Sequence, residues 1–177
     1  DNMRIVDDVA TIEKATDLLY TASGTGAGFT LDKANTDVCG ENSALSWKVT
    51  YGGAEGTKYP TFWITLDQGY DLTNKNVVVD VKFEGASQAL RVEKMENSSN
   101  ESLVVGRSAN FSYVELGDGW YRATLNSSAL TLNDGMNLTD VKMIALGLTT
   151  NGFDNAVYLD NMRIVDDVAT IEKATDL

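Results

Sequence analysis

The sequence predicts an all-β protein, an antiparallel β-sandwich of the jelly-roll type. Short stretches of alternating apolar and polar residues recur along most of the chain. Turn-forming sequences such as Gly-Gly, Gly-Asp-Gly and Asn-Gly separate them, and the 177 residues include one proline. About seven to nine such stretches with turns between them describe a sandwich, in which each strand buries one face and exposes the other.

The N-terminal part of the chain is expected to be irregular. Residues 9–19 have apolar side chains at a spacing that allows a short helix, but Thr11 and Thr16 disfavour it, so we expect a linker with weak helical character. Residues 19–28 contain three glycines and are expected to form an irregular lead-in to the sandwich.

Two central strands have a clear alternation. The strand predicted for residues 43–51 has on one face Leu45, Trp47, Val49 and Tyr51. The strand predicted for residues 59–66 has on one face Phe62, Ile64 and Leu66, and on the other Tyr59, Thr61, Trp63 and Thr65. The remaining strands are expected at 76–83, around Leu90 and Val92, and at 111–116, 120–125, 141–149 and 156–165.

Residues 1–18 and 160–177 are identical, with an offset of 160 − 1 = 159 residues. Such an identity indicates either a tandem array of near-identical units or a deliberate duplication, and we favour the array. The predicted organisation is a junction at 1–18, a β-sandwich domain at 19–165 and a linker at 166–177. The chain opens on Asp1 rather than Met, so we expect a mature fragment or an internal piece of a longer protein.

Composition excludes several functional classes. With 26 acidic and 14 basic residues, a net charge of −12 and a pI of about 4.3, the chain is expected to bind neither nucleic acid nor a membrane surface. Histidine is absent, which removes Ser-His and Cys-His nucleophiles. Cys39 is the single cysteine and is expected to be a small, at least partly buried side chain. No pair of carboxylates stands out as a glycosidase pair, so we expect no enzyme activity.

The order of the strand motifs resembles a known family. The motifs are SALSWKV, YDLTNKNVVVDVKF, ELGDGWYRATL, DVKMIALGL and AVYLDNMRI. Together they are similar to the jelly-roll carbohydrate-binding modules of the galactose-binding-domain-like group, which accompany bacterial glycoside hydrolases. The resemblance covers roughly residues 29–165, and its most specific element is the final Tyr-Leu-Asp-Asn.

The resemblance implies a structural calcium ion, with Asp160 as the best candidate ligand. Asp32 and Glu41, in the loop before the SALSWKV strand, are possible partners, because calcium takes six to eight oxygen ligands from carboxylates and carbonyls. The alternatives stay open. Asp160 is either a ligand or a buried hydrogen-bond acceptor, and Asp32 and Glu41 are equally well explained as solvated loop charges.

Sugar binding needs an uncovered aromatic ring, on which the apolar face of a pyranose packs. The alternation assigns Trp47 to the core, and Trp120, beside a tight turn, is expected to be structural. Trp63 faces outward with Tyr59, which makes these two rings the predicted platform unless another chain or the repeated segment covers them. Polar neighbours are expected from Gln88, Arg91 and Tyr113, although Arg91 is also explained as an ordinary surface arginine.

Two functions follow from these observations. The first is a non-catalytic module that binds a polysaccharide or oligosaccharide, repeated along a secreted or cell-surface protein of bacterial style, where several weak sites raise the apparent affinity. The alternative is a structural repeat of a surface adhesin or extracellular filament. In that case the repeated DNMRIV sequence, which has the alternation of an edge strand, adds to the sheet of a neighbouring identical unit.

Overall fold

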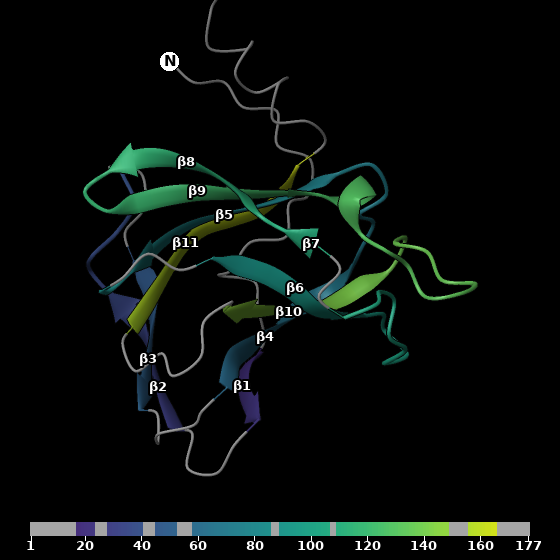
Figure 1. Cartoon of the computed structure of the whole chain (residues 1–177), viewed down its shortest axis with the longest axis horizontal. Helices are drawn as coiled ribbons and strands as arrows, with labels where there is room; N and C mark the ends of the chain where they lie inside the picture. Colours follow the sequence, from purple (N-terminus) through teal and green to yellow (C-terminus); the bar gives the residue numbers. More distant parts are fainter. Residues whose placement is uncertain are drawn as a thin grey trace, which may run out of the picture.

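A computed structural model describes residues 17–23, 28–40, 45–52, 58–85, 89–106, 109–148 and 156–165. Within them the chain forms two stacked sheets (Figure 1). The strands are, in chain order, β1 (Asp17–Ser23), β2 (Gly28–Asn35), β3 (Ser46–Gly52), β4 (Lys58–Tyr70), β5 (Asn76–Phe83), β6 (Leu90–Glu96), β7 (Ala109–Asn110), β8 (Ser112–Gly117), β9 (Trp120–Asn126), β10 (Val141–Leu148) and β11 (Ala156–Val165). The predicted antiparallel β-sandwich is confirmed.

One sheet has five strands in the order β1-β4-β10-β6-β7, and the other has six in the order β2-β3-β11-β5-β9-β8. All pairings between neighbouring strands are antiparallel. One turn of 3-10 helix, Ser127–Ala129, follows β9. Within the part of the chain that the structure describes, no helix has the length and apolar character needed to cross a membrane.

The core lies between the two sheets and consists of the inward positions of each alternating strand. β4 contributes Ile64 and Leu66, and β5 contributes Val77, Val79 and Val81, all with an exposed fraction of 0%. Each such side chain stabilises the fold by about 1.5–3 kcal/mol through the apolar surface it removes from water. Trp47 belongs to this core with 6% exposed, as the alternation predicts.

The N-terminal prediction is wrong where the structure tests it. β1 runs from Asp17 to Ser23 and pairs with β4, so residues 17–23 form an edge strand and not the end of a linker followed by an irregular lead-in. Backbone pairing with the long β4 decides this conformation, which the local sequence does not indicate. Residues 9–16 lie outside the described residues.

Leu45 was expected to share the buried face with Trp47, and this prediction is also wrong. The Leu45 side chain is 47% exposed because the strand begins one residue later, at Ser46, so the alternation does not extend to it. Trp120 is buried, with 2% exposed, as a structural tryptophan should be. It packs, however, with Ala156 and Tyr158 in a second apolar cluster, apart from the main core.

β11 lies between β3 and β5 in the six-stranded sheet, but its DNMRIV part, residues 160–165, extends beyond the pairing with β3. The interpretation of the repeated DNMRIV sequence as an edge strand that adds to a neighbouring unit therefore stays a prediction. β11 pairs with β3 over residues 156–159 and with β5 over residues 157–165. The register shifts between Asp160 and Arg163, and Asn161 there has a left-handed backbone with φ of 47°. Such a bulge places an extra residue in one strand and redirects the side chains beside it.

Candidate functional site

Trp63 lies on the outer face of the five-stranded sheet, as the alternation predicts. Ile64, the next residue in β4, is fully buried, whereas Trp63 is half-buried. The register places Trp63 between Leu19 of β1 and Ala145 of β10. Tyr59, its predicted companion, lies in β4 as well, but the position of its side chain is outside the described residues.

The next strand, β10, has small residues beside Trp63. Ala145 lies opposite Trp63, and Gly147 lies opposite Thr61. Because Ala145 and Gly147 have small side chains or none, side chains from β6, the next strand in the sheet, can lie over β10. The Glu93 side chain lies where a Cβ at Gly147 would be, so any larger residue there would collide with it.

β6 brings charged side chains to the same face as Trp63. Arg91 forms an ion pair with Glu93, and Lys94 forms one with Glu96. The Arg91 and Glu93 side chains are 13% and 17% exposed, so this pair is largely enclosed. We call the surface formed by Thr61, Trp63, Ala145, Gly147, Arg91, Glu93, Lys94 and Glu96 the Trp63 face.

Charge and aromatic surface meet on the Trp63 face. Lys94 Nζ lies 5.3 Å from the centroid of the Trp63 ring, within the range of a cation–π contact. An indole ring offers an apolar plane, and the two ion pairs place hydrogen-bond donors and acceptors next to it. This combination of a flat apolar ring with neighbouring polar groups suits a ligand that has both an apolar face and hydroxyl groups.

The structure places two of the three predicted polar neighbours of Trp63, one on the Trp63 face and one away from it. Arg91 lies opposite Gly147 and therefore joins the Trp63 face. Tyr113 does not, because it is in β8 of the other sheet, packs against the main core and accepts a hydrogen bond from the Leu90 backbone N–H at 2.5 Å. Burial raises the pKa of its phenol, so it stays a neutral structural group. Gln88 lies outside the described residues.

Sequence reasoning missed Glu93, Lys94 and Glu96. In β6, Leu90, Val92 and Met95 are fully buried, which breaks the alternation between Val92 and Met95. The register shift opposite Ala145 and Leu146 explains this change of phase. The spacing of apolar residues in LRVEKME is the one signal that could have revealed the bulge, and with it the outward direction of Lys94.

The outer face of the six-stranded sheet has a different character, with a buried carboxylate at its centre. Asp80 is 1% exposed and accepts two hydrogen bonds from Arg122, at 2.9 and 3.3 Å, and a third from Asn161 at 3.1 Å. Arg163 lies 3.9 Å away. Such a charge is stable when buried only because several donors surround it.

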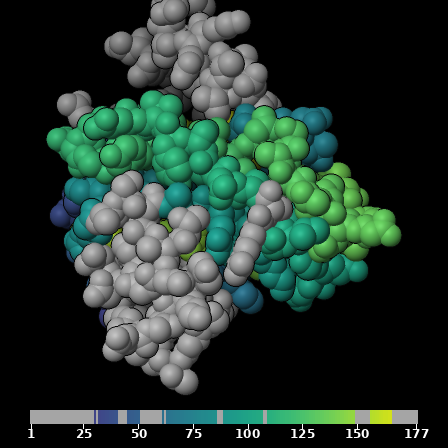
Figure 2. Space-filling view, in the orientation of Figure 1, coloured from purple at the N-terminus to yellow at the C-terminus, as the bar shows by residue number. Residues whose placement is uncertain are grey.

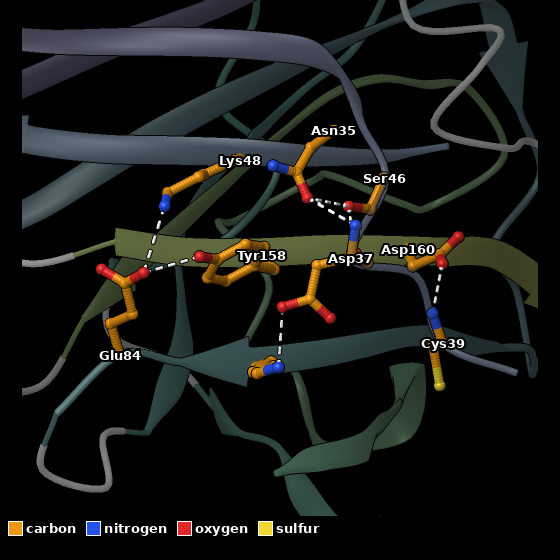
Figure 3. A network of polar contacts seen from close by, with 9 residues as sticks. Asn35, Asp37, Cys39, Ser46, Lys48, Glu84, Tyr158 and Asp160 are labelled. Carbon is orange, nitrogen blue, oxygen red and sulfur yellow. Dashed lines mark hydrogen bonds and ion pairs between the residues drawn. The ribbon is translucent and has the colours of Figure 1, made fainter. Parts of the chain in front are cut away.

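The Asp160-Asn161 pair, from the motif that carries the family resemblance, fixes a loop to this face. Asp160 is fully buried and accepts a hydrogen bond from the Cys39 backbone N–H at 2.8 Å (Figure 3). Asn161 donates to the Cys39 carbonyl at 3.2 Å and reaches it because of the bulge. The pair therefore holds both backbone groups of Cys39.

Two of the three predicted calcium ligands, Asp32 and Asp160, lie in the described part of the chain, on the separate strands β2 and β11. Asp32 lies in strand β2 and not in a loop as expected, and its exposed side chain accepts a hydrogen bond from the Ala34 backbone N–H at 2.9 Å. The register places it opposite Lys48, which lies opposite Tyr158 and not Asp160. No group of three or more Cys, Asp or Glu side chains able to hold a metal occurs among the described residues, and Glu41 lies outside them.

Tyr158 and Trp120 are not available as a second platform. Their rings meet edge to face with centroids 6.3 Å apart and are only 5% and 2% exposed. Lys48 lies 4.9 Å above the Tyr158 ring, and the Tyr158 hydroxyl donates to Glu84 at 2.6 Å (Figure 3). The hydrogen bond from Tyr158 and the ion pair with Lys48 lower the pKa of Glu84. These contacts seal the rings from a ligand.

A shallow pocket of about 250 Å³ lies where the chain around residue 100 meets the chain around residue 138, and these segments lie side by side in Figure 2. Its lining consists of Asn97, Glu101, Leu103, Gly135, Met136, Asn137, Thr139 and Asp140. This lining has no aromatic ring, so the pocket lacks the apolar plane that the Trp63 face provides.

Cys39 is expected to react slowly with thiol reagents. Burial, together with the nearby Asp80 and Asp160 carboxylates, raises the pKa of its thiol from 9.0 to about 11. At pH 8 the folded protein should therefore react about 100-fold more slowly than the denatured chain, because the thiolate is the nucleophile. Equal rates in buffer and in denaturant would contradict this assignment.

The same raised pKa sets a pH dependence of stability. The protonated Cys39 thiol contributes to the free energy of unfolding. This contribution is fully present below pH 9, and it is lost as the pH rises towards about 11. A Cys39→Ala variant should lose part of the alkaline decrease in melting temperature.

Known structures share this architecture, although no family model and no curated protein matches the chain. The family 30 carbohydrate-binding module of the cellulosomal cellulase Cel9D-Cel44B of Clostridium thermocellum matches with a TM-score of 0.61 at 15% identity, over 90% of this chain and 98% of that one. A family 11 module from Clostridium thermocellum, in complex with a β-1,3-1,4-mixed-linked tetrasaccharide, matches with a TM-score of 0.55 at 12% identity, over 89% of this chain and 95% of that one. The chain thus has the jelly-roll β-sandwich fold of carbohydrate-binding modules, and the resemblance seen in its motifs is confirmed at the level of the fold.

Proposed function

We propose that this chain is a non-catalytic carbohydrate-binding module that holds a glycan on the Trp63 face. The observation that carries the proposal is the outward, half-buried Trp63 with Lys94 Nζ 5.3 Å from its ring. The fold shared with family 11 and family 30 modules supports it. A sugar ring would pack on the indole, and its hydroxyl groups would bind the charged groups of β6.

The charges of the Trp63 face favour a neutral glycan. Arg91 and Lys94, its two cations, form ion pairs with Glu93 and Glu96, so the four charges sum to zero. A sulfated or uronic acid-rich polymer would approach a protein of net charge −12 and would compete with Glu93 and Glu96 for these cations. We therefore expect a neutral polysaccharide to bind more tightly than an acidic one.

A binding screen tests the proposal. Affinity gel electrophoresis and calorimetry with soluble plant and algal polysaccharides should give retardation and saturable heat with at least one neutral glycan. A β-1,3-1,4-linked glucan is a suitable first probe, because a structurally similar module was solved with a tetrasaccharide of that linkage. Absence of binding across neutral and acidic glycans would contradict the proposal.

A structural calcium ion at Asp160 stays a prediction. The family resemblance of the Tyr-Leu-Asp-Asn motif supports it, whereas the burial of the Asp160 carboxylate and its hydrogen bonds from the backbone N–H groups of Cys39 and Asn161 fit the alternative, a buried hydrogen-bond acceptor. If calcium binds there, the melting temperature should rise with millimolar CaCl₂ and fall with EDTA, because a ligand of the folded state stabilises it. A melting temperature that is unchanged by either addition would exclude the ion.

We also propose that the chain is one unit of a tandem-repeat protein at the cell surface or outside the cell. The identity of residues 1–18 and 160–177 supports the repeat, and several linked sites would raise the avidity for a polymer. The adhesin or filament alternative predicts linear polymers by light scattering or electron microscopy, whereas a binding module predicts monomers. Residues 160–165, one copy of DNMRIV, already pair with β5, so addition to a neighbouring sheet would fall to the other copy, residues 1–6.

A further inference from the structure

Residues 160–165 are built into the sandwich along their whole length. Their backbone pairs with β5, from Asp160 opposite Asp80 to Val165 opposite Asn76. Met162 and Ile164 enter the main core with 1% and 6% exposed. We call the position that these six residues fill, beside β5 and over the core, the closing site.

The polar side chains of this segment make contacts as specific as those of its apolar ones. Asp160 accepts a hydrogen bond from Cys39, and Asn161 bridges Cys39 and Asp80. Arg163 donates to the Asn161 carbonyl at 2.6 Å, which stabilises the bulge. A segment must therefore match both the apolar and the polar positions to fill the closing site.

Residues 1–6 meet this requirement, because they have the same sequence, Asp-Asn-Met-Arg-Ile-Val. We propose that the closing site is a docking site for residues 1–6 of this chain, which replace residues 160–165 whenever that copy is absent or damaged. Every contact of residues 160–165 can be made by its counterpart 159 positions earlier, including Met3 for Met162 and Ile5 for Ile164. This proposal does not depend on glycan binding.

The chain between residues 1–6 and the rest of the sandwich has the length that this docking needs. Asp17 lies opposite Thr65, and Val165 lies opposite Asn76. The path from Val6, docked in place of Val165, to Asp17 covers 17 − 6 = 11 residue steps, and the path from Thr65 to Asn76 covers 76 − 65 = 11. Eleven steps reach about 36–40 Å when extended, so the same molecule can fill its own closing site.

A chain that ends at Leu159 would on this account still contain one whole sandwich. Residues 1–18 have the same sequence as residues 160–177. Residues 1–159 therefore hold every part of one sandwich in circularly permuted order, with the chain ends inside β11. In a tandem array, the first six residues of each 18-residue segment would complete one sandwich. The last two residues of the same segment, which correspond to Asp17 and Leu18, would begin β1 of the next sandwich.

Four full-length proteins test the proposal by thermal unfolding: the parent, Met3→Asp/Ile5→Asp, Met162→Asp/Ile164→Asp, and the variant with all four changes. We expect the first variant to melt like the parent, since residues 160–165 are intact. The second should keep a cooperative transition, because residues 1–6 take over, and the fourfold variant should lose it. Native mass spectrometry then distinguishes docking in the same molecule, which gives monomers, from docking in a neighbour, which gives oligomers.

A chain ending at Leu159 provides the second measurement, in case the damaged C-terminal copy obstructs the site. It should unfold cooperatively, and the same chain with Met3→Asp/Ile5→Asp should not. The proposal is overturned if, in both backgrounds, damage to residues 1–6 makes no difference to folding.

Discussion

Replacing Trp63 with alanine should weaken glycan binding by about 10- to 100-fold, the effect of losing roughly 1.5–3 kcal/mol of apolar contact with a stacked sugar ring. The side chain is half-buried on the outer face of the five-stranded sheet and contributes nothing to the main core, so the variant should remain folded. Calorimetry with the tightest ligand of the binding screen measures the change.

Two control variants make the Trp63 result specific. Trp63→Phe keeps an aromatic plane and should retain most of the affinity. Val114→Ala removes a side chain that is 65% exposed on β8, in the other sheet, and should bind like the parent. If Trp63→Ala binds as tightly as the parent while its melting temperature is unchanged, the ring is not the platform.

Replacing Arg122 with leucine should lower the free energy of unfolding by about 2 kcal/mol, less than for a fully buried ion pair because the Arg122 side chain is 37% exposed. Asp80, which is 1% exposed, would lose two hydrogen bonds, while the hydrogen bond from Asn161 at 3.1 Å and the contact with Arg163 at 3.9 Å would remain. The melting temperature should fall by about 4–8 °C, which differential scanning calorimetry resolves.

The double variant Asp80→Asn/Arg122→Leu separates loss of charge balance from loss of packing. Asparagine is neutral and can still accept the hydrogen bond from Asn161, so the double variant should be more stable than Arg122→Leu alone. A double variant less stable than the single one would contradict the view that an uncompensated carboxylate causes the loss.

The alternation of residues predicted most of the fold because both sheets are half-buried, which imposes a period of two on the sequence. The outward direction of Trp63 and the burial of Trp47 follow from it directly. Alternation does not indicate the structure where contacts between residues distant in sequence decide it. β1 is a strand because it pairs with β4, which no local pattern in residues 17–23 indicates.

The candidate site was predicted only in part, because alternation gives the direction of a side chain within one strand and says nothing about which strands are neighbours. Trp63 and Arg91 lie on one face because β10 lies between β4 and β6, an order that the sequence does not reveal. Tyr113, another predicted polar neighbour of Trp63, belongs to β8 of the other sheet. The bulge in β6 changes the phase of the alternation, so the sequence does not indicate that Lys94 and Glu96 point outward.

The most direct test uses the three indole N–H resonances of the protein in ¹⁵N-labelled NMR spectra, assigned by single Trp→Phe variants. The structure places Trp47 in the core and Trp120 in the sealed second cluster, and it leaves Trp63 on an outer face. During titration with a bound oligosaccharide, the Trp63 resonance should shift most, while those of Trp47 and Trp120 stay nearly constant. Saturable binding that leaves the Trp63 resonance unmoved would contradict the assignment of the Trp63 face as the glycan site.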